Sequence, residues 1–165
     1  MEYLIRTYKK GEEHYVADAH RRVYSEEYNW GDSFISYAAK VAADFASKKP
    51  SSREGLWVAE DFISSKLVGC IMLCETDEKD VGQLRLFLVE KAYRRYGIGS
   101  ALTKELLDHA KQAGYKKLIL WTASPLTEAI DHYKRLGFII TESVDNAEWS
   151  NCKETLQEIK MEMIL

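Results

Sequence analysis

The most continuous apolar run of the chain is residues 84–89, LRLFLV, which leads into a basic loop with two glycines. A strand with so little polar alternation is typical of the centre of a sheet, where both faces are covered. After the loop, apolar side chains recur with helical period through residues 98–113, and Gly114 follows at a position typical of helix ends. A second apolar run, residues 116–121, predicts another strand. This order predicts a parallel βαβ unit over residues 83–122.

The other periodicities predict two early helices and further strands around this unit. Apolar side chains at helical spacing predict helices over residues 12–28 and 34–46. Pro125 predicts the start of a later helix, which stops at Gly137. The remaining predicted strands are residues 1–8, 56–61, 67–75, 138–140 and 159–165. Because helices come early and later strands alternate with helices, we expect an α/β or α+β fold around a mixed sheet, with residues 159–165 at an edge.

Composition and charge limit the possible functions. The chain has 165 residues, of which 46% are hydrophobic and 30% charged. This predicts one domain, residues 1–165, with its own core. A formal net charge of −3 argues against nucleic acid as a partner. No apolar run is long enough to span a bilayer and no apolar leader stands at the amino terminus, so we expect no membrane partner and a cytoplasmic location.

The cysteines and histidines predict neither a disulfide nor a metal site. Cys70, Cys74 and Cys152 are odd in number and lack metal-ligand grouping. Cys70 and Cys74 share one face of a predicted strand but stand too far apart to be bridged, so we interpret them as core thiols. The histidines on the predicted helices have no partners at metal-ligand spacing.

The basic loop, residues 94–99, has the features of an anion site. Gly97 and Gly99 allow a ligand to approach the backbone closely. The first turn of the following helix leaves its N–H groups unpaired at the positive end of the dipole, and Arg94 and Arg95 add forked donors. A missing third glycine excludes the dinucleotide fingerprint, and no Gly-Lys-Ser/Thr follows as in a P-loop. From these residues alone, a phosphate site and a basic turn with a glycine cap both remain open.

Four segments, in the right order and spacing, resemble the GNAT N-acetyltransferase superfamily. RRYGIG at 94–99 resembles its pyrophosphate-binding signature, and AIDHYKRLGF at 129–138 resembles its later helix with a tyrosine before Gly-Phe. Residues 56–60 and 66–69 resemble the paired strands that precede the core. Along nearly its whole length the chain is similar to a subgroup sometimes fused to MarR-type regulators.

The resemblance implies a mixed, mostly antiparallel central sheet flanked by helices, and acetyl-CoA as co-substrate. It implies coenzyme contacts at Leu88, Val89, Arg94, Arg95, Tyr96, Gly97, Ile98, Gly99 and Ser100. Near Leu88 and Val89 neighbouring strands are expected to splay and leave amides free for the pantetheine arm and the acetyl carbonyl. Leu126 stands where many relatives have an asparagine that contacts the coenzyme. Ser124 and Thr127 are the candidates to replace that contact.

Tyr133 is the predicted catalytic acid. Its place on the apolar stripe of its helix is also typical of a core residue, whereas its match to the family's tyrosine favours proton donation to the departing thiolate. A phenol, with a pKa near ~10, donates to a strongly basic thiolate or stabilises it by a hydrogen bond. The general base stays open. The candidates are His20, Glu26, Glu27, Glu75, Asp77 and a water.

The sequence therefore predicts an acetyl-CoA-dependent N-acetyltransferase in which a primary amine attacks directly in a ternary complex. The acceptor is a small-molecule or peptide amine, and the acidic balance favours a cationic small molecule. Tyr24, Tyr28 and Trp30 either line the acceptor cleft or belong to the core. The alternative is a non-catalytic acetyl-CoA-binding sensor or interaction module. If the terminal strand needs covering at its edge, the protein forms a homodimer.

Overall fold

Seven strands form one sheet in the computed structural model, which describes residues 1–165. The strand order is β1-β2-β3-β4-β5-β7-β6, and only the β4–β5 pair is parallel. The strands are β1 (Tyr3–Thr7), β2 (Gly55–Asp61), β3 (Leu67–Glu75), β4 (Val81–Val89), β5 (Lys117–Ala123), β6 (Ile139–Asn146) and β7 (Leu156–Ile164). The helices are α1 (Glu13–Tyr28), α2 (Asp32–Ser47), α3 (Ile98–Gln112) and α4 (Thr127–Leu136), with a short 3₁₀ turn η1 (Lys91–Tyr93). The predicted mixed, mostly antiparallel sheet with a parallel βαβ core is confirmed.

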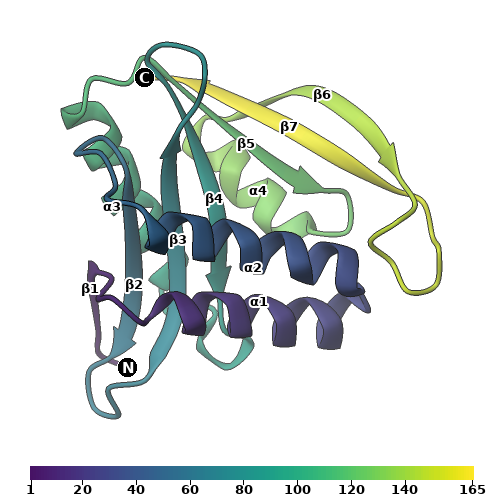
Figure 1. Cartoon of the computed structure of the whole chain (residues 1–165), viewed down its shortest axis with the longest axis horizontal. Coiled ribbons are helices and arrows are strands. Elements are labelled where there is room, and N and C mark those ends of the chain that lie inside the picture. The colour runs from purple at the N-terminus through teal and green to yellow at the C-terminus, as the bar shows by residue number, and fades with distance from the viewer.

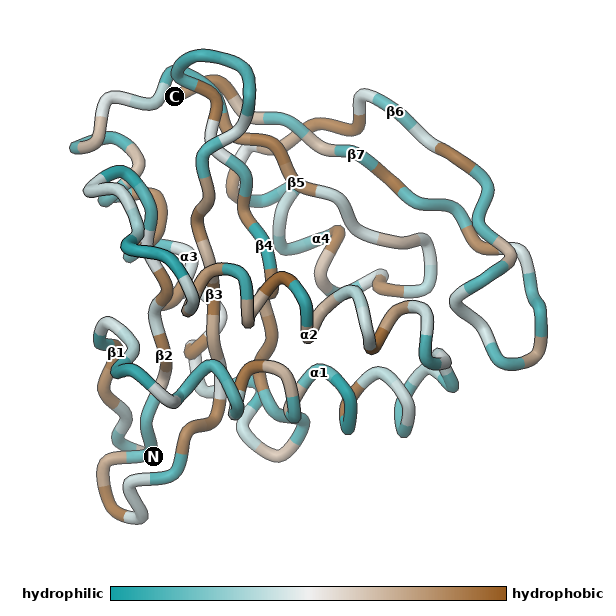
Figure 2. Tube along the Cα trace, viewed as in Figure 1, coloured by the Kyte–Doolittle hydropathy of each residue, from teal (hydrophilic) through white to brown (hydrophobic).

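Helices cover both faces of the central strands. α1 and α2 lie side by side on one face of β2–β4, whereas α3 and α4 lie on the other face (Figure 1). Alternate side chains of β2 pack against the helices on opposite faces of the sheet: Leu56 and Val58 pack with α1 and α2, and Trp57 packs with α3. Figure 2 shows hydrophobic colour concentrated along these central strands, as expected for strands buried on both faces.

Two irregularities in β4 open the sheet. β4 pairs with β5 only at Val81–Gln83, and beyond this point the two strands separate. Toward β3, two residues of β4 between Arg85 and Leu88 oppose one residue, which makes a β-bulge where Leu86 has a φ of 49°. A leucine at positive φ is strained and is held there only by its surroundings. The result is a gap between β4 and β5, which is the splay implied by the family resemblance.

The strand order corrects the expected edge. β7 pairs with β5 on one side and with β6 on the other, so the terminal strand is interior because both sides of its backbone are hydrogen-bonded. At this end of the sheet the edge strand is instead β6, which extends the predicted strand 138–140 as far as Asn146. The later helix begins at Thr127 rather than at Pro125, because a turn comes first in which the Leu126 amide donates to the Ala123 carbonyl at 2.9 Å.

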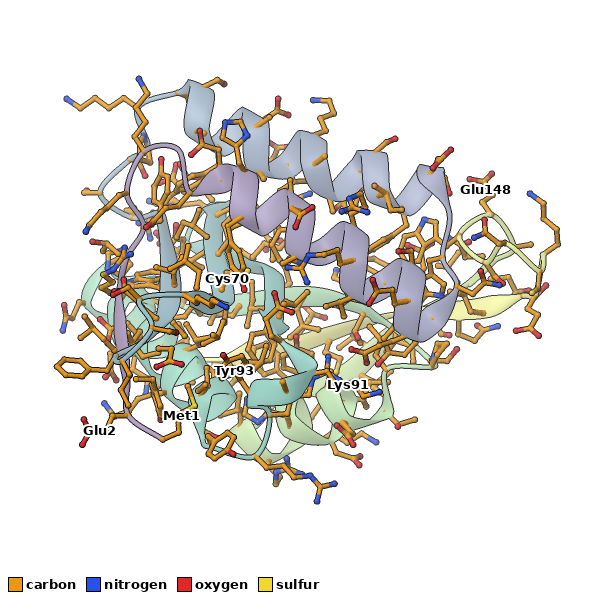
Figure 3. All side chains as sticks on the ribbon, turned by 90° about the horizontal axis from the view of Figure 1, so that it is seen from below. Met1, Glu2, Cys70, Lys91, Tyr93 and Glu148 are labelled. Atoms are coloured by element: carbon orange, nitrogen blue, oxygen red, sulfur yellow. The ribbon has the colours of Figure 1, made fainter.

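The three cysteines are free thiols in different environments. Cys70 is buried between α1 and the sheet, as Figure 3 shows, while Cys74 is half-buried and Cys152 is exposed. Burial raises the pKa of the Cys70 thiol and raises that of Cys74 to about 11, so both are neutral thiols. The interpretation of Cys70 as a core thiol is confirmed. None of the helices is both long and apolar enough to cross a membrane.

Candidate active site

Two cavities meet at the gap between β4 and β5. The basic cavity, of about 400 Å³, lies at the start of α3, and the aromatic cavity, of about 600 Å³, lies between α2 and strands β4 to β7. Tyr24, Phe87, Leu126 and Ala129 line both, so the cavities adjoin each other. A molecule in one cavity can therefore reach a molecule in the other through the gap.

The basic cavity brings together nearly all the residues predicted to bind the coenzyme. The predicted residues that line it are Leu88, Val89, Arg94, Arg95, Gly97, Ile98, Gly99 and Ser100. Tyr96 is not part of the lining, and its side chain is 52% exposed to solvent. Arg135 of α4 also lines the cavity, and no sequence motif had pointed to it.

The start of α3 presents unpaired backbone donors to this cavity. α3 begins at Ile98, Gly97 precedes it with a φ of 81°, and no side chain caps the helix. The first-turn N–H groups consequently lack partners within the protein, and the helix dipole places partial positive charge behind them. At Gly99 a Cβ atom would lie 3.3 Å from Cζ of Phe87, so glycine keeps the floor of the cavity open. Such a donor set fits the diphosphate of a coenzyme.

The two arginines of the loop have different surroundings. Arg94 donates two hydrogen bonds of 2.8 Å to the carboxylate of Glu27 on α1, and its Nε donates to the Val89 carbonyl at 3.0 Å. Its guanidinium thus holds the loop against α1. Arg95 is exposed, and no carboxylate lies within ion-pair distance of it. Arg95 is therefore available to bind an anion. Glu27 does not pair with Arg95, because both of its oxygens accept hydrogen bonds from Arg94.

One backbone amide of β4 points into the gap. The Glu90 amide donates to the Val68 carbonyl of β3 at 2.8 Å. Because amide direction alternates along a strand, the N–H of Leu88 also points toward β3, while that of Val89 points away from it. Of the two residues predicted near the splay, Val89 is the one that offers a free donor.

Tyr133 belongs both to the core and to the aromatic cavity. Its side chain is 5% exposed, and its ring centroid lies 6.0 Å from that of Phe87 and 5.9 Å from that of Phe138. Burial raises the pKa of the phenol above its ordinary value, and no hydrogen bond from the protein acts on it. The hydroxyl is thus a protonated, unpaired donor in the wall of the cavity.

Aromatic rings form most of the acceptor-side wall. Tyr24, Trp30 and Phe34 pack together with ring centroids 4.7 to 5.1 Å apart, so Tyr24 and Trp30 are both core and lining. Tyr28 lines the basic cavity instead. Tyr37 and Trp121 are 46% and 41% exposed and belong to the cavity's open side. The sequence did not single out Tyr37, Trp121 or the charged lining residues, because they come from elements far apart in the chain.

The loop between β6 and β7 closes one end of the aromatic cavity. Its Trp149 carbonyl accepts a hydrogen bond of 2.7 Å from the amide of Gly31, and the Asn151 amide donates to the Asn29 carbonyl at 2.9 Å. These bonds fasten the loop to the turn between α1 and α2. In Figure 3, Glu148 lies on this loop beyond the ends of both helices.

Among the candidate bases, His20 alone lines the aromatic cavity. Its Nδ1 lies 2.7 Å from the Val16 carbonyl, which can only accept, so Nδ1 carries the proton and Nε2 is an acceptor. Burial lowers the pKa of His20 to about 4, so the ring is neutral near pH 7. Glu26 is exposed on α1, and Glu75 pairs with Gly82 at the opposite end of β4 from Val89.

Two further predictions can be placed on the structure. Asp77 follows β3 on the exposed connection to β4, at the same remote end as Glu75. Ser124 and Thr127 line neither of the two cavities described above, whereas Leu126 lines both. At the position of the family's asparagine the wall of both cavities is therefore formed by an apolar side chain.

Comparisons with known proteins agree with this arrangement. Residues 13–138 match the acetyltransferase (GNAT) family. Probable N-acetyltransferase 14 of Xenopus tropicalis is 33% identical over 86 residues, covering 52% of this chain and 41% of that protein. The chain thus spans less than half the length of this curated relative.

Solved structures share the fold over the whole chain. An acetyltransferase of the GNAT family from Streptococcus pneumoniae has a TM-score of 0.76 at 22% identity, covering 99% of this chain and 100% of that one. A putative acetyltransferase from Salmonella typhimurium, solved with its cofactor acetyl-CoA, has a TM-score of 0.75 at 15% identity, covering 100% and 95%. With the family match over residues 13–138, the chain belongs to the acetyltransferase (GNAT) family.

Proposed function

We propose that the protein transfers the acetyl group of acetyl-CoA to a primary amine by direct attack in a ternary complex. The observation that carries this proposal is the gap between β4 and β5, which joins a basic cavity to an aromatic one. The basic cavity suits the coenzyme diphosphate, and the aromatic cavity suits the body of a small-molecule or peptide amine.

Two groups of residues hold the coenzyme in this proposal. The first-turn amides of α3, residues 98–100, bind the diphosphate, and Arg95 and Arg135 add positive charge from two sides. Arg94 acts indirectly, because its ion pair with Glu27 fixes the loop to α1. Leu88, Gly97 and Gly99 shape the wall, whereas the exposed Tyr96 contributes only its backbone.

Two groups act at the reacting carbonyl. Acetyl-CoA, when bound, supplies a thioester whose carbonyl is attacked by the amine. The Val89 N–H donates a hydrogen bond to that carbonyl oxygen, where negative charge develops. Tyr133 donates to the departing sulfur, since its hydroxyl is protonated and has no competing partner in the protein.

The acceptor has to be a free amine when it attacks the thioester. His20, with a pKa of about 4, is too weak a base to deprotonate an alkylammonium, whose pKa is close to that of lysine at ~10.4. Its Nε2 instead accepts a hydrogen bond from the amine or from a water that carries the proton away.

A thiol-release assay with acetyl-CoA and a panel of amines tests the proposal. We expect free thiol to form only when a suitable amine is present. Calorimetric binding of acetyl-CoA without thiol release from any amine would instead identify a sensor or interaction module. If acetyl-CoA does not bind, the assignment of the basic cavity is wrong.

The wider proposals concern the domain, its location and its assembly. Residues 1–165 make up the acetyltransferase domain, since strands from both ends of the chain belong to one sheet. Three free cysteines suit the reducing cytoplasm. A homodimer would form at β6, the edge strand.

A further inference from the structure

The arginines of this protein fall into two classes. Eight arginines occur in the sequence, and most have a carboxylate within 4 Å. The paired ones are Arg6, Arg21, Arg22, Arg53 and Arg94. Arg85, Arg95 and Arg135 have no such partner, and each lines one of the two cavities. Coenzyme binding accounts for Arg95 and Arg135 but leaves Arg85 unexplained.

Arg85 lies in the aromatic cavity, and no carboxylate is within ion-pair distance of it. It is half-buried on β4, and its Nη2 donates to the Tyr37 hydroxyl at 2.6 Å. Its guanidinium carbon is 5.6 Å from the centroid of the same ring. The neighbouring Cys74 thiol is neutral, since burial raises its pKa to about 11. These neutral partners orient the guanidinium but do not compensate its charge, and it retains donors for a planar anion.

A carboxylate in the same cavity also lacks an ionic partner. Glu158 of β7 is half-buried and lines the aromatic cavity. Its Oε2 accepts a hydrogen bond of 3.2 Å from the Asn146 side chain, and no lysine or arginine lies within ion-pair distance. Arg85 on β4 and Glu158 on β7 are thus an uncompensated cation and an uncompensated, half-buried anion in a single cavity with aromatic walls. Glu148, on the loop between β6 and β7, also lines this cavity without an ion pair, but it is exposed to solvent.

We infer that the acceptor carries a carboxylate close to its amine and has an apolar or aromatic body, as an amino acid does. Arg85 binds the acceptor's carboxylate through its forked donors, and Glu158 attracts the ammonium before it loses its proton. This inference rests on the proposed function and narrows its acceptor. It replaces the purely cationic amine suggested by net charge, because the charges of the cavity rather than those of the whole chain meet the substrate.

Matched pairs of amines test the inference. Thiol release is measured with phenylalanine against phenylalaninamide and with tryptophan against tryptophanamide. Each amide keeps the shape of the acid but lacks its negative charge. The amine of the amide is also less basic, so a larger fraction of it is unprotonated. This difference favours the amide and therefore cannot produce a preference for the acid. We expect kcat/KM to be at least ~10-fold higher for the acid, the scale of a hydrogen-bonded charge that the amide cannot supply.

Variants test whether Arg85 is the residue that distinguishes the acid from the amide. Arg85→Gln is expected to bring the acid-to-amide ratio close to one while leaving acetyl-CoA affinity by calorimetry unchanged, and Arg85→Lys to restore part of the ratio. Arg21→Gln is the control, since Arg21 is 54% exposed on α1 and lines neither cavity. Its ratio should match that of the unmodified protein.

Three results would overturn the inference. These are equal or better use of the amides, an acid preference that survives in folded Arg85→Gln, and no thiol release from either pair by protein that releases thiol with another amine of the panel. Absence of thiol release from every amine, or failure to bind acetyl-CoA, counts against the proposed function instead, so the two failures are distinguishable.

Discussion

At the scale of single residues, Tyr133 has a packed ring and an unpaired hydroxyl. Tyr133→Phe keeps the ring and removes a group that has no hydrogen bond in the protein. We expect turnover to fall by ~10²-fold, the usual scale for a positioned acid. The free energy of unfolding should change by less than ~1 kcal/mol, because no intramolecular hydrogen bond is lost. Steady-state kinetics and a melting curve check both expectations.

Tyr115→Phe is the matched control for this change. Tyr115 is 4% exposed and its buried hydroxyl also lacks a partner, but it lines neither cavity. Turnover of Tyr115→Phe should equal that of the unmodified protein. Full activity of Tyr133→Phe would remove the support for its catalytic role.

His20 makes stability depend on pH. Its pKa is about 4 in the folded protein, against ~6.5 for an unperturbed histidine. Between these values the unfolded chain binds a proton that the folded chain does not, so stability is full above pH 6.5 and falls as pH decreases toward 4. At ~1.4 kcal/mol per pKa unit, the loss is on the order of 3 kcal/mol.

Denaturant unfolding at several pH values measures this effect. His20→Asn, whose amide can still donate to the Val16 carbonyl, should flatten the curve between pH 6.5 and 4.5. Burial also lowers the pKa of His132, which leaves a smaller slope of the same sign in the variant. Identical slopes in both proteins would show that His20 is not buried as a neutral ring.

At the scale of elements, substitutions at the two ends of α3 distinguish an effect on coenzyme binding from an effect on helix stability. Gly97 and Gly114 stand at opposite ends of the helix with φ values of 81° and 83°. Asparagine tolerates this conformation better than other side chains, so both Gly→Asn changes should have similar small costs in stability. Only Gly97→Asn places a side chain in the basic cavity.

Titration calorimetry with acetyl-CoA distinguishes the two variants. We expect at least ~10-fold weaker binding for Gly97→Asn, since a diphosphate needs close approach to the backbone. Binding by Gly114→Asn should be unchanged, because nothing lies within 4 Å of its Cβ position. Equal affinities for the two would place the coenzyme elsewhere.

At the scale of the whole molecule, β6 is an open edge. Its Ile139, Ile140 and Val144 side chains are 66%, 47% and 43% exposed, and one side of its backbone has no neighbouring strand. Exposed apolar edges favour pairing with another chain. We expect a dimer mass by light scattering at micromolar concentration, and a shift toward monomer in Ile140→Lys. Ile63→Lys, at an 87% exposed position on the β2–β3 turn, is the control. A monomer in the unmodified protein would contradict the expectation.

Local sequence determined most elements and the position of the basic, glycine-containing loop before α3. The βαβ core over residues 83–122 was predictable because strand and helix periods depend on neighbours a few positions apart. Gly97, Gly99 and the start of α3 were predictable for the same reason, since a helix terminus offers its donors wherever it begins. The family motifs lie in such continuous segments, so they too could be identified from the sequence alone.

Tertiary structure decided which groups remain free to act. Arg94 and Arg95 are equivalent in sequence, but Glu27, distant in the chain, pairs with the first and leaves the second unpaired. The bulge at Leu86, the interior position of β7 and the uncompensated charge of Arg85 likewise depend on strands that meet only in the folded sheet. A sequence shows each side chain's chemistry, but its availability depends on neighbours brought together by long-range packing.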